Sequence, residues 1–123
     1  MKNIINDPYQ VVEEMVDGFF KGYPHPLMAV EGSKRALMRK NAPIKDKVAI
    51  VTGGGAGHIP VFLGYVGQGL GDGVAIGNVF SSPVSEDMVG ASRAVHGGKG
   101  VLFLLRNYGG YDLNFSLASG TAE

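Results

Sequence analysis

The sequence predicts an α/β fold in which helices cover a parallel or mixed sheet. Three short segments, residues 48–52, 74–76 and 101–105, are apolar throughout. Such runs are typical of strands that are buried on both faces of a parallel sheet. The 20 glycines among the 123 residues cluster at the ends of these segments. The order of strand, glycine-rich loop, helix and strand indicates a βαβ unit.

The first predicted element is a helix that precedes the strands. Asp7 is a suitable N-cap and Pro8 suits the first helical position. Apolar residues then recur at helical spacing until Gly22; they are Val11, Val12, Met15, Val16, Phe19 and Phe20. We therefore expect an amphipathic helix that ends near residue 22.

Residues 23–41 are expected to be irregular. Residues 23–26 contain two prolines and are predicted to form a loop. A basic stretch follows, and we interpret it as a solvated arm; it consists of Lys34, Arg35, Arg39 and Lys40. The chain is accordingly divided into an N-terminal helix and arm, 1–46, and an α/β core, 47–123.

Two further helices are predicted after the second and third strands. Ser82 and Pro83 favour a helix start with Ser82 as N-cap, and an acidic first turn with Glu86 and Asp87 suits the positive end of a helix. This helix should end at residues 97–98, which are both glycine. Asp112 begins the last helix, and no strand follows it. Because three strands make a thin sheet, we expect the chain to be a fragment, a truncated product or half of a two-part protein.

Composition excludes several classes of function. Eleven basic and eleven acidic residues balance, which argues against nucleic acid or an anionic membrane as the main partner. No apolar run reaches 18 residues, and the first residues lack the apolar region of a secretory signal. With no cysteine there is no disulfide or thiolate chemistry. We expect a soluble, cytoplasmic protein.

The loop after the first strand carries the clearest functional signal. Residues 53–58 contain four glycines and end in His58. The loop is not a Walker A motif, and His58 stands where the third glycine of a dinucleotide-binding loop would be. Glycine loses much conformational freedom on folding, so four of them need a reason. Either they permit tight packing of strand against helix, or their backbone N–H groups hold an oxygen-rich ligand.

Polar residues follow each of the three strands and should meet at one edge of the sheet. His58 follows the first strand, Ser82 the second and Arg106 the third. Right-handed crossovers place the carboxyl ends of parallel strands together, where open α/β sheets bind ligands. His58 can accept a proton from a hydroxyl or hydrogen-bond to it. Capping alone would explain Ser82 and Asp112, yet three polar loops at one edge favour a ligand site.

Four motifs in order resemble the substrate-binding subunit of dihydroxyacetone kinases. They are Gly-Gly-Gly-Ala-Gly-His-Ile-Pro from residue 53, Gly-Tyr-Val-Gly-Gln-Gly-Leu from residue 64, Phe-Ser-Ser-Pro from residue 80, and Asn-Tyr-Gly-Gly from residue 107 with Asn-Phe at 114–115. The opening Lys-Asn-Ile-Ile-Asn-Asp also resembles that family's start. The resemblance covers essentially the whole chain, but only the first part of a family member.

The resemblance implies a site for a short-chain hydroxyketone whose terminal hydroxyl is phosphorylated. It implies that Gly54 and Gly55 contact the substrate through their backbone, that His58 hydrogen-bonds to it, and that Ser82 lies nearby. Arg106 stands where the family commonly has lysine. In the family a histidine from later in the chain forms a covalent hemiaminal with the substrate, and a carboxylate acts as base.

The resemblance also implies partners. ATP or ADP with magnesium would sit in a separate helical nucleotide-binding domain or subunit, so no metal or cofactor is expected on this chain. Family members form homodimers. We predict catalytic roles for His58 and Asp112, and the predicted substrate-binding residues are Gly54, Gly55, His58, Ser82, Arg106 and Tyr111.

Two departures from the family pattern leave other functions open. Tyr111 stands where the family's catalytic aspartate is found, and Asp112 comes one residue later. The hemiaminal-forming histidine would lie beyond residue 123, so we expect the isolated chain to be inactive. The alternatives are a non-catalytic regulatory paralogue that binds a ketose, or a kinase for a four-carbon ketose such as erythrulose.

Overall fold

The computed structural model describes residues 4–22, 27–58 and 61–122. Five strands form one sheet: β1 (Leu27–Ala29), β2 (Ala36–Arg39), β3 (Ala49–Gly55), β4 (Gly73–Gly77) and β5 (Val101–Leu104). The helices are α1 (Val11–Gly22), α2 (Ser85–Val95) and α3 (Gly109–Ala122), with short 3₁₀ turns η1 (Ala56–His58) and η2 (Leu63–Tyr65). None of these described helices is long and apolar enough to cross a membrane.

The sheet is mixed, with strand order β1-β2-β4-β3-β5. β3 lies parallel to both β4 and β5, and Thr52 pairs with Val74 on one side and Leu104 on the other. β2 runs antiparallel to β4, and β1 antiparallel to β2. The predicted α/β class is therefore confirmed, and the carboxyl ends of β3, β4 and β5 meet at one edge.

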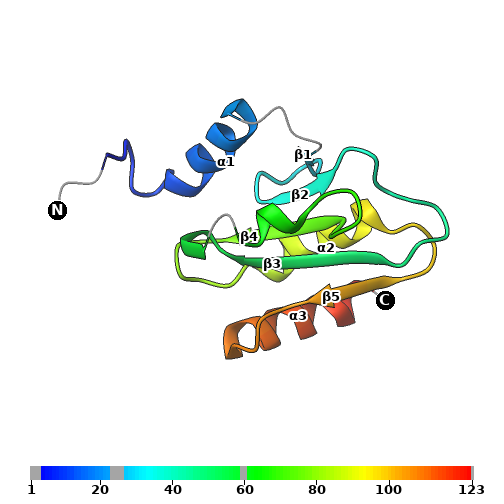
Figure 1. Ribbon diagram of the computed structural model, residues 1–123. Helices are drawn as coiled ribbons and strands as arrows, with labels where there is room; N and C mark the ends of the chain where they lie inside the picture. Colours follow the sequence, from blue (N-terminus) through cyan, green and yellow to red (C-terminus); the bar gives the residue numbers. More distant parts are fainter. Residues whose placement is uncertain (1–3, 23–26, 59–60, 123) are drawn as a thin grey trace.

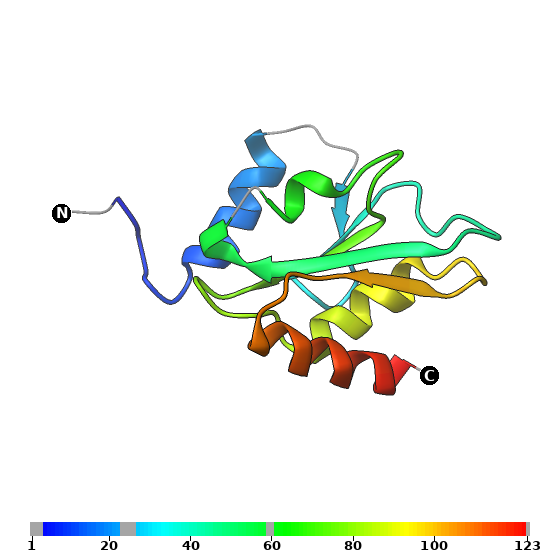
Figure 2. The ribbon, with the colours of Figure 1, turned by 60° about the horizontal axis from the view of Figure 1, so that its bottom comes forward.

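Helices cover the two faces of the sheet unequally. Figures 1 and 2 show α2 and α3 side by side against one face, whereas α1 and η2 lie on the other. On the first face, Met88 of α2 and Phe115 of α3 are buried in the core. Val12 and Val16 of α1 are also buried, as the helical spacing of apolar residues predicts.

The prediction of an irregular segment at 23–41 is wrong for residues 27–29 and 36–39, which form β1 and β2. These strands have only three and four residues, too few for a periodic pattern to reveal them. The predicted loop at 23–26 lies outside the described residues. The two arginines of the basic stretch are not solvated: Arg39 is 3% exposed and pairs with Asp72, while Arg35 pairs with Glu13.

The expectation that every strand is covered on both faces is wrong for β5. Its residues alternate between half-buried and exposed, and Leu102 and Leu104 are about half exposed. β5 is an edge strand that pairs only with β3 among the described strands. A continuous apolar run therefore does not distinguish a strand covered on both faces from one whose second face is open.

None of the three predicted helix starts is confirmed: α1 begins at Val11, three residues after Pro8, and neither Ser82 nor Asp112 is an N-cap. α2 begins at Ser85 after an extended Val84, with no side-chain cap, so Ser82 lies three residues before the helix. α3 begins at Gly109, which puts Asp112 inside its first turn. The acidic first turn of α2, with Glu86 and Asp87, is confirmed. Ser82 does not cap a helix and instead packs against the start of α3. A Cβ added to Gly110 would lie 2.8 Å from the Oγ of Ser82.

Candidate functional site

The loops after β3, β4 and β5 enclose a cavity of about 310 Å³ at the carboxyl edge of the sheet. Its lining consists of His58, Phe80, Ser81, Ser82, Arg106, Tyr108 and Tyr111. Segments that are distant in sequence thus meet at one place, as the strand order requires. Of the predicted site residues, the cavity brings together His58, Ser82, Arg106 and Tyr111. Gly54, Gly55 and Asp112 are not among its lining residues.

His58 ends η1, directly after β3, and its ring forms one wall of the cavity. The imidazole meets Phe80 edge-on at a centroid distance of 5.7 Å and Phe62 at 6.3 Å. These two rings fix the orientation of the imidazole without using its nitrogens. Within the described ranges no hydrogen bond to either ring nitrogen is found, so both are available to a ligand.

Phe80 forms the outer wall of the cavity in an unusual backbone conformation. Its φ is 55°, in the left-handed region that bulky residues rarely adopt, and its side chain is 75% exposed. Gly57 allows this ring to approach, because a Cβ there would lie 3.0 Å from it. Residues held in sparsely populated backbone conformations cluster at functional sites.

Tyr111 forms the floor of the cavity and connects α3 to β3. Its side chain is 5% exposed, and its hydroxyl accepts a hydrogen bond from the backbone N–H of Gly55 at 3.2 Å. The ring packs against Phe62, Tyr108 and Phe115. Because the phenol oxygen is the acceptor, its own proton remains to be donated.

Packing accounts for the two glycines that were expected to contact a ligand. A Cβ on Gly54 would lie 1.8 Å from the Phe62 ring, and one on Gly55 would lie 2.8 Å from the carbonyl oxygen of Ser81. The N–H of Gly55 is already bonded to Tyr111. Both glycines are therefore needed for close packing, against an aromatic ring and a loop backbone, and their contact with a ligand stays a prediction.

The remaining predicted residues differ in their position. Ser82 is half-buried beneath the start of α3, and Asn114 of α3 donates to the carbonyl of Pro83 at 2.8 Å. Arg106 is exposed and belongs to no ion pair found in the described part of the chain. Asp112 is exposed outside the cavity, so its predicted role as base has no support from this geometry.

Sequence reasoning missed three lining residues, namely Phe80, Ser81 and Tyr108. Each belongs to a loop that was already singled out. Their position in loops that follow strands could have identified these three residues as part of the site, whereas their residue types could not. The left-handed φ of Phe80, which turns its ring toward His58, has no sequence signal of its own.

A network of polar side chains supports the loop after β4 from its far side. Arg35 donates to Glu13 Oε1 at 2.7 Å and to Asn78 Oδ1 at 2.6 Å. The hydrogen bond from Arg35 holds the pKa of Glu13 below its usual range. Asn78 also accepts the N–H groups of Ala56 and Ser81 through its backbone carbonyl. The network therefore connects α1 and the residue before β2 to both loops that carry His58 and Ser82.

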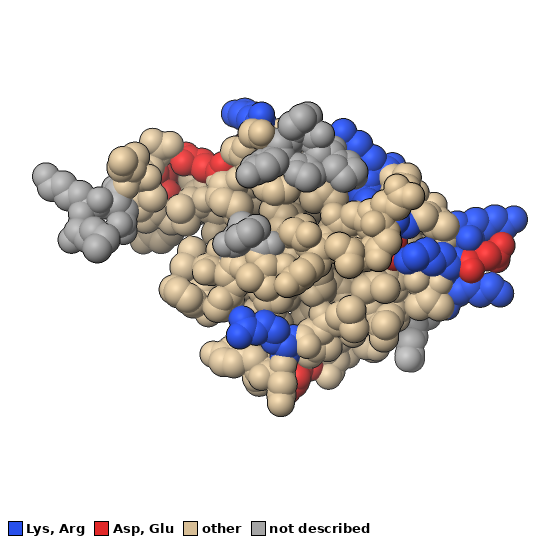
Figure 3. All heavy atoms as spheres, in the orientation of Figure 1, with Lys and Arg blue, Asp and Glu red and all other residues tan. Residues whose placement is uncertain are grey.

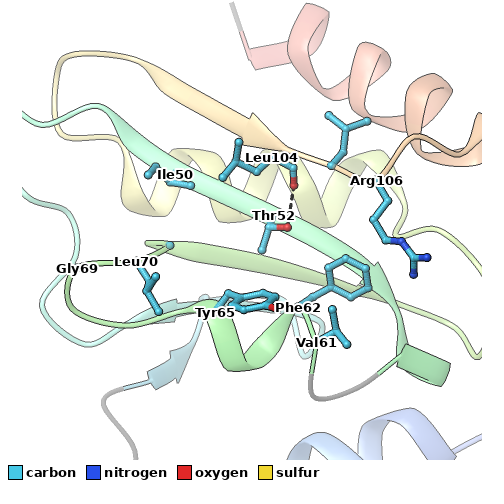
Figure 4. Close-up of a pocket in the computed structure, with 11 residues that line it drawn as sticks. Ile50, Thr52, Val61, Phe62, Tyr65, Gly69, Leu70, Leu104 and Arg106 are labelled. Carbon is cyan, nitrogen blue, oxygen red and sulfur yellow. Dashed lines mark hydrogen bonds between the residues drawn. The ribbon is translucent and has the colours of Figure 1, made fainter.

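An apolar groove of about 450 Å³ lies beside the cavity, on the open face of β3 and β5 (Figure 4). Its lining is Ile50, Thr52, Val61, Phe62, Tyr65, Gly69, Leu70, Gly71, Leu104, Leu105 and Arg106. Thr52 satisfies its hydroxyl by donating to the carbonyl of Leu104 at 2.7 Å. Figure 3 shows that charged side chains are sparse over this part of the surface. Arg106 lines both hollows, at the boundary between them.

Comparison with known proteins gives a consistent result. The model of the family described as the Dak1 domain matches residues 17–123. The chain is 38% identical over 122 residues to the dihydroxyacetone-binding subunit DhaK of PTS-dependent dihydroxyacetone kinase 2 from Listeria innocua, covering 99% of the chain and 37% of that protein. It is 40% identical over 118 residues to D-erythrulose kinase from Mycolicibacterium smegmatis, covering 96% of the chain and 20% of that protein.

Two solved structures extend the comparison to the fold. Dihydroxyacetone kinase from C. freundii, in complex with AMP-PNP and Mg²⁺, matches with a TM-score of 0.91 and 33% identity, covering 98% of this chain and 23% of that one. The dihydroxyacetone kinase operon co-activator Dha-DhaQ matches with a TM-score of 0.80 and 33% identity, covering 89% and 33%. The chain thus spans between about a fifth and two fifths of the length of these proteins.

Proposed function

Because the chain belongs to the Dak1 domain family, we propose that it forms the hydroxyketone-binding part of a dihydroxyacetone (glycerone) kinase subunit. The reaction would be phosphorylation of the terminal hydroxyl of a short-chain ketose. One observation supports this proposal most strongly: His58, Ser82 and Arg106, each from a different loop, line a single cavity with Tyr111. The family relationship indicates the substrate class, and the cavity supplies groups that suit it.

The lining residues suggest how a hydroxyketone would be held. His58 has two unbonded ring nitrogens within the described ranges, Ser82 a hydroxyl, and Tyr111 a proton to donate. These groups would hydrogen-bond to hydroxyl and carbonyl oxygens and fix the position of the substrate. Positioning provides much of the rate gain in phosphoryl transfer. His58 is the lining side chain best suited to accept the hydroxyl proton, so we assign it the role of base in preference to Asp112.

The family resemblance leads us to propose that a separate helical nucleotide-binding domain or subunit carries ATP or ADP with magnesium. No group of three or more His, Cys, Asp or Glu side chains comes together in the residues that the structure describes. The family resemblance further leads us to propose a cytoplasmic homodimer.

A chimera tests the proposed function. The matching segment of the Listeria innocua subunit is replaced by residues 1–123, and dihydroxyacetone phosphorylation is measured with that subunit's own phosphorylation partners. We expect activity in the chimera and a loss of about 100-fold in kcat/KM on His58→Ala, since general acid–base groups contribute at least that much. His96→Ala, an exposed histidine at the end of α2, is the matched control. A chimera that folds but has no activity would contradict the kinase proposal.

A regulatory function is the second candidate. Two observations favour it: the cavity lining described here contains no carboxylate, and one similar structure is an operon co-activator. In that case the folded chimera would bind dihydroxyacetone and not phosphorylate it. Erythrulose is the alternative substrate, since a D-erythrulose kinase is among the similar proteins. Assaying the active chimera with both ketoses separates the two substrates.

A further inference from the structure

Arg35 is fixed through both its backbone and its guanidinium. Its N–H donates to Ser33 Oγ at 3.0 Å, and its carbonyl accepts the N–H of Ile76 in β4 at 2.8 Å. The guanidinium donates through Nε and Nη2 to Glu13 Oε1, at 3.0 and 2.7 Å, and through Nη1 to Asn78 Oδ1 at 2.6 Å. A planar guanidinium that is anchored on a carboxylate presents its other N–H groups in a fixed direction. Arg35 therefore holds Asn78 from a rigid support.

Asn78 is the residue through which Arg35 reaches two loops of the cavity. It follows β4 directly, and its backbone carbonyl accepts the N–H groups of Ala56 at 3.1 Å and Ser81 at 3.0 Å. Ala56 begins the turn that ends at His58, and Ser81 lines the cavity. One backbone carbonyl thus joins the loop after β3 to the loop after β4.

The two loops are packed too closely to move independently. A Cβ on Gly55 would lie 3.0 Å from the carbonyl oxygen of Asn78 and 2.8 Å from that of Ser81. Phe80, two residues after Asn78, meets the imidazole of His58 at a centroid distance of 5.7 Å, with the ring planes 83° apart. Close-packed groups transmit a displacement to their neighbours. A shift of Asn78 would therefore move both the backbone that carries the imidazole and the ring against which it lies.

We propose that Arg35 is a positioning residue: by holding Asn78, it sets the place of the His58 imidazole relative to the loop after β4. The inference rests on the proposed function, because His58 is the residue assigned there to the hydroxyketone. Arg35 does not line that cavity; it lines a second hollow of about 450 Å³, and Ser81 and Ser82 line both. A misplacement of about 1 Å costs as much as about 100-fold in rate, so support at this distance matters to the site.

NMR spectra of the ligand-free 123-residue chain test this role without an assay of activity. The readouts are the amide signals of His58 and Ser81 and the Cε1 proton of the imidazole, whose chemical shift depends on the neighbouring aromatic rings. We expect Arg35→Ala to move all three signals. Lys34→Ala, which removes a charge from the adjacent exposed residue, is the control and should leave them in place.

Substitutions of Asn78 test the path. Asn78→Ala removes the acceptor of the Arg35 bond and leaves the pair between Arg35 and Glu13 intact, so it should move the same signals even if Arg35→Ala does not fold. Asn78→Asp keeps an oxygen for the guanidinium and should leave the signals near their parent positions. The double variant Arg35→Ala/Asn78→Ala should shift them no further than either single variant, because both remove the same interaction.

Kinetics of the chimera connect this position to the substrate. We expect Arg35→Ala to raise KM for dihydroxyacetone about tenfold, the loss that one missing hydrogen bond produces. Lys34→Ala should leave KM unchanged. A variant that is merely less stable would lower kcat through the loss of folded enzyme and would not raise KM.

Three results would overturn the inference. The first is a pair of folded variants, Arg35→Ala and Asn78→Ala, whose His58 signals keep their parent positions. The second is a double variant in which the two shifts add, because the residues would then act independently. The third is an active Arg35→Ala chimera with unchanged KM. A folded but inactive chimera that retains Arg35 contradicts the proposed function instead, and the ligand-free spectra still decide the role of Arg35.

Discussion

The phenol oxygen of Tyr111 lies 3.2 Å from the backbone nitrogen of Gly55 and accepts its hydrogen bond. This contact joins the first turn of α3 to the end of β3, across 56 residues of sequence. It satisfies a backbone N–H at the end of β3 that would otherwise be buried without an acceptor. The glycine loop and α3 therefore behave as one structural unit at the edge of the sheet.

Replacing Tyr111 by phenylalanine should remove the hydrogen bond between α3 and the end of β3. The buried N–H of Gly55 would lose its acceptor while the ring packing against Phe62 is kept. We expect Tyr111→Phe to lower the free energy of unfolding by about 1 kcal/mol, measured by chemical denaturation. Tyr9→Phe, at an exposed tyrosine, is the control and should have no effect. An unchanged stability of Tyr111→Phe would mean that the hydrogen bond contributes nothing.

Asp72 should be the most sensitive charged residue of the fold. It is 2% exposed, pairs with Arg39 and Lys47, and accepts the N–H of Ile50 at 2.7 Å. Asp72→Asn would leave the buried guanidinium of Arg39 without a compensating charge. We expect a loss of about 3–5 kcal/mol in the free energy of unfolding. Asp17→Asn, on the exposed side of α1, should change it little; similar losses for both variants would argue against this role.

The Glu13–Arg35 pair predicts a pH dependence of stability. Because Arg35 lowers the pKa of Glu13, the charged carboxylate stabilises the folded protein. That contribution is complete above the ordinary glutamate pKa of about 4.3 and disappears as the pH falls through the lowered value. Glu13→Gln should therefore be less stable than the parent at pH 7, and the gap should close in acid. Glu31→Gln, at an exposed position, is the control for removing a negative charge. A gap that widens in acid would refute the assignment.

Gly54 should tolerate no side chain. Its missing Cβ leaves room for the buried Phe62 ring, which would otherwise lie 1.8 Å away. We expect Gly54→Ala to destabilise the protein by about 1–3 kcal/mol through overpacking, as thermal unfolding would show. Gly18→Ala, in α1 with no atom near its added Cβ, should instead be neutral or stabilising by up to about 1 kcal/mol. If both substitutions were tolerated equally, the glycine at 54 would not be needed for packing.

Much of the fold and part of the site could be predicted from sequence. The three parallel strands, a first helix that ends near residue 22 and the meeting of three loops were predictable because apolar runs and strand-end glycines reflect local constraints. β1 and β2 were not, because they are short and because β1 pairs with β2, and β2 with β4, only in the folded chain. The burial of Arg39 was also hidden, since its partner Asp72 is 33 residues away and charge patterns show only local sequence.

Within the site, the residue types allowed us to predict which chemical groups are present, but not where every side chain lies. His58, Ser82 and Arg106 were expected to meet, and they do. The exclusion of Asp112 could not be foreseen, because it depends on where α3 begins. A start at Gly109 places Tyr111 inside and Asp112 outside, and a shift of one residue on a helix rotates a side chain by about 100°.

The most direct test of a shared ligand cavity is an NMR titration of the ¹⁵N-labelled chain with dihydroxyacetone. His58, Ser82 and Arg106 lie in the loops after β3, β4 and β5, so their amide signals report on each loop separately. We expect all three to shift together and to saturate at one dissociation constant. Shifts confined to a single loop, shifts centred on the apolar groove around Leu70, or no saturable shift at all would contradict the account.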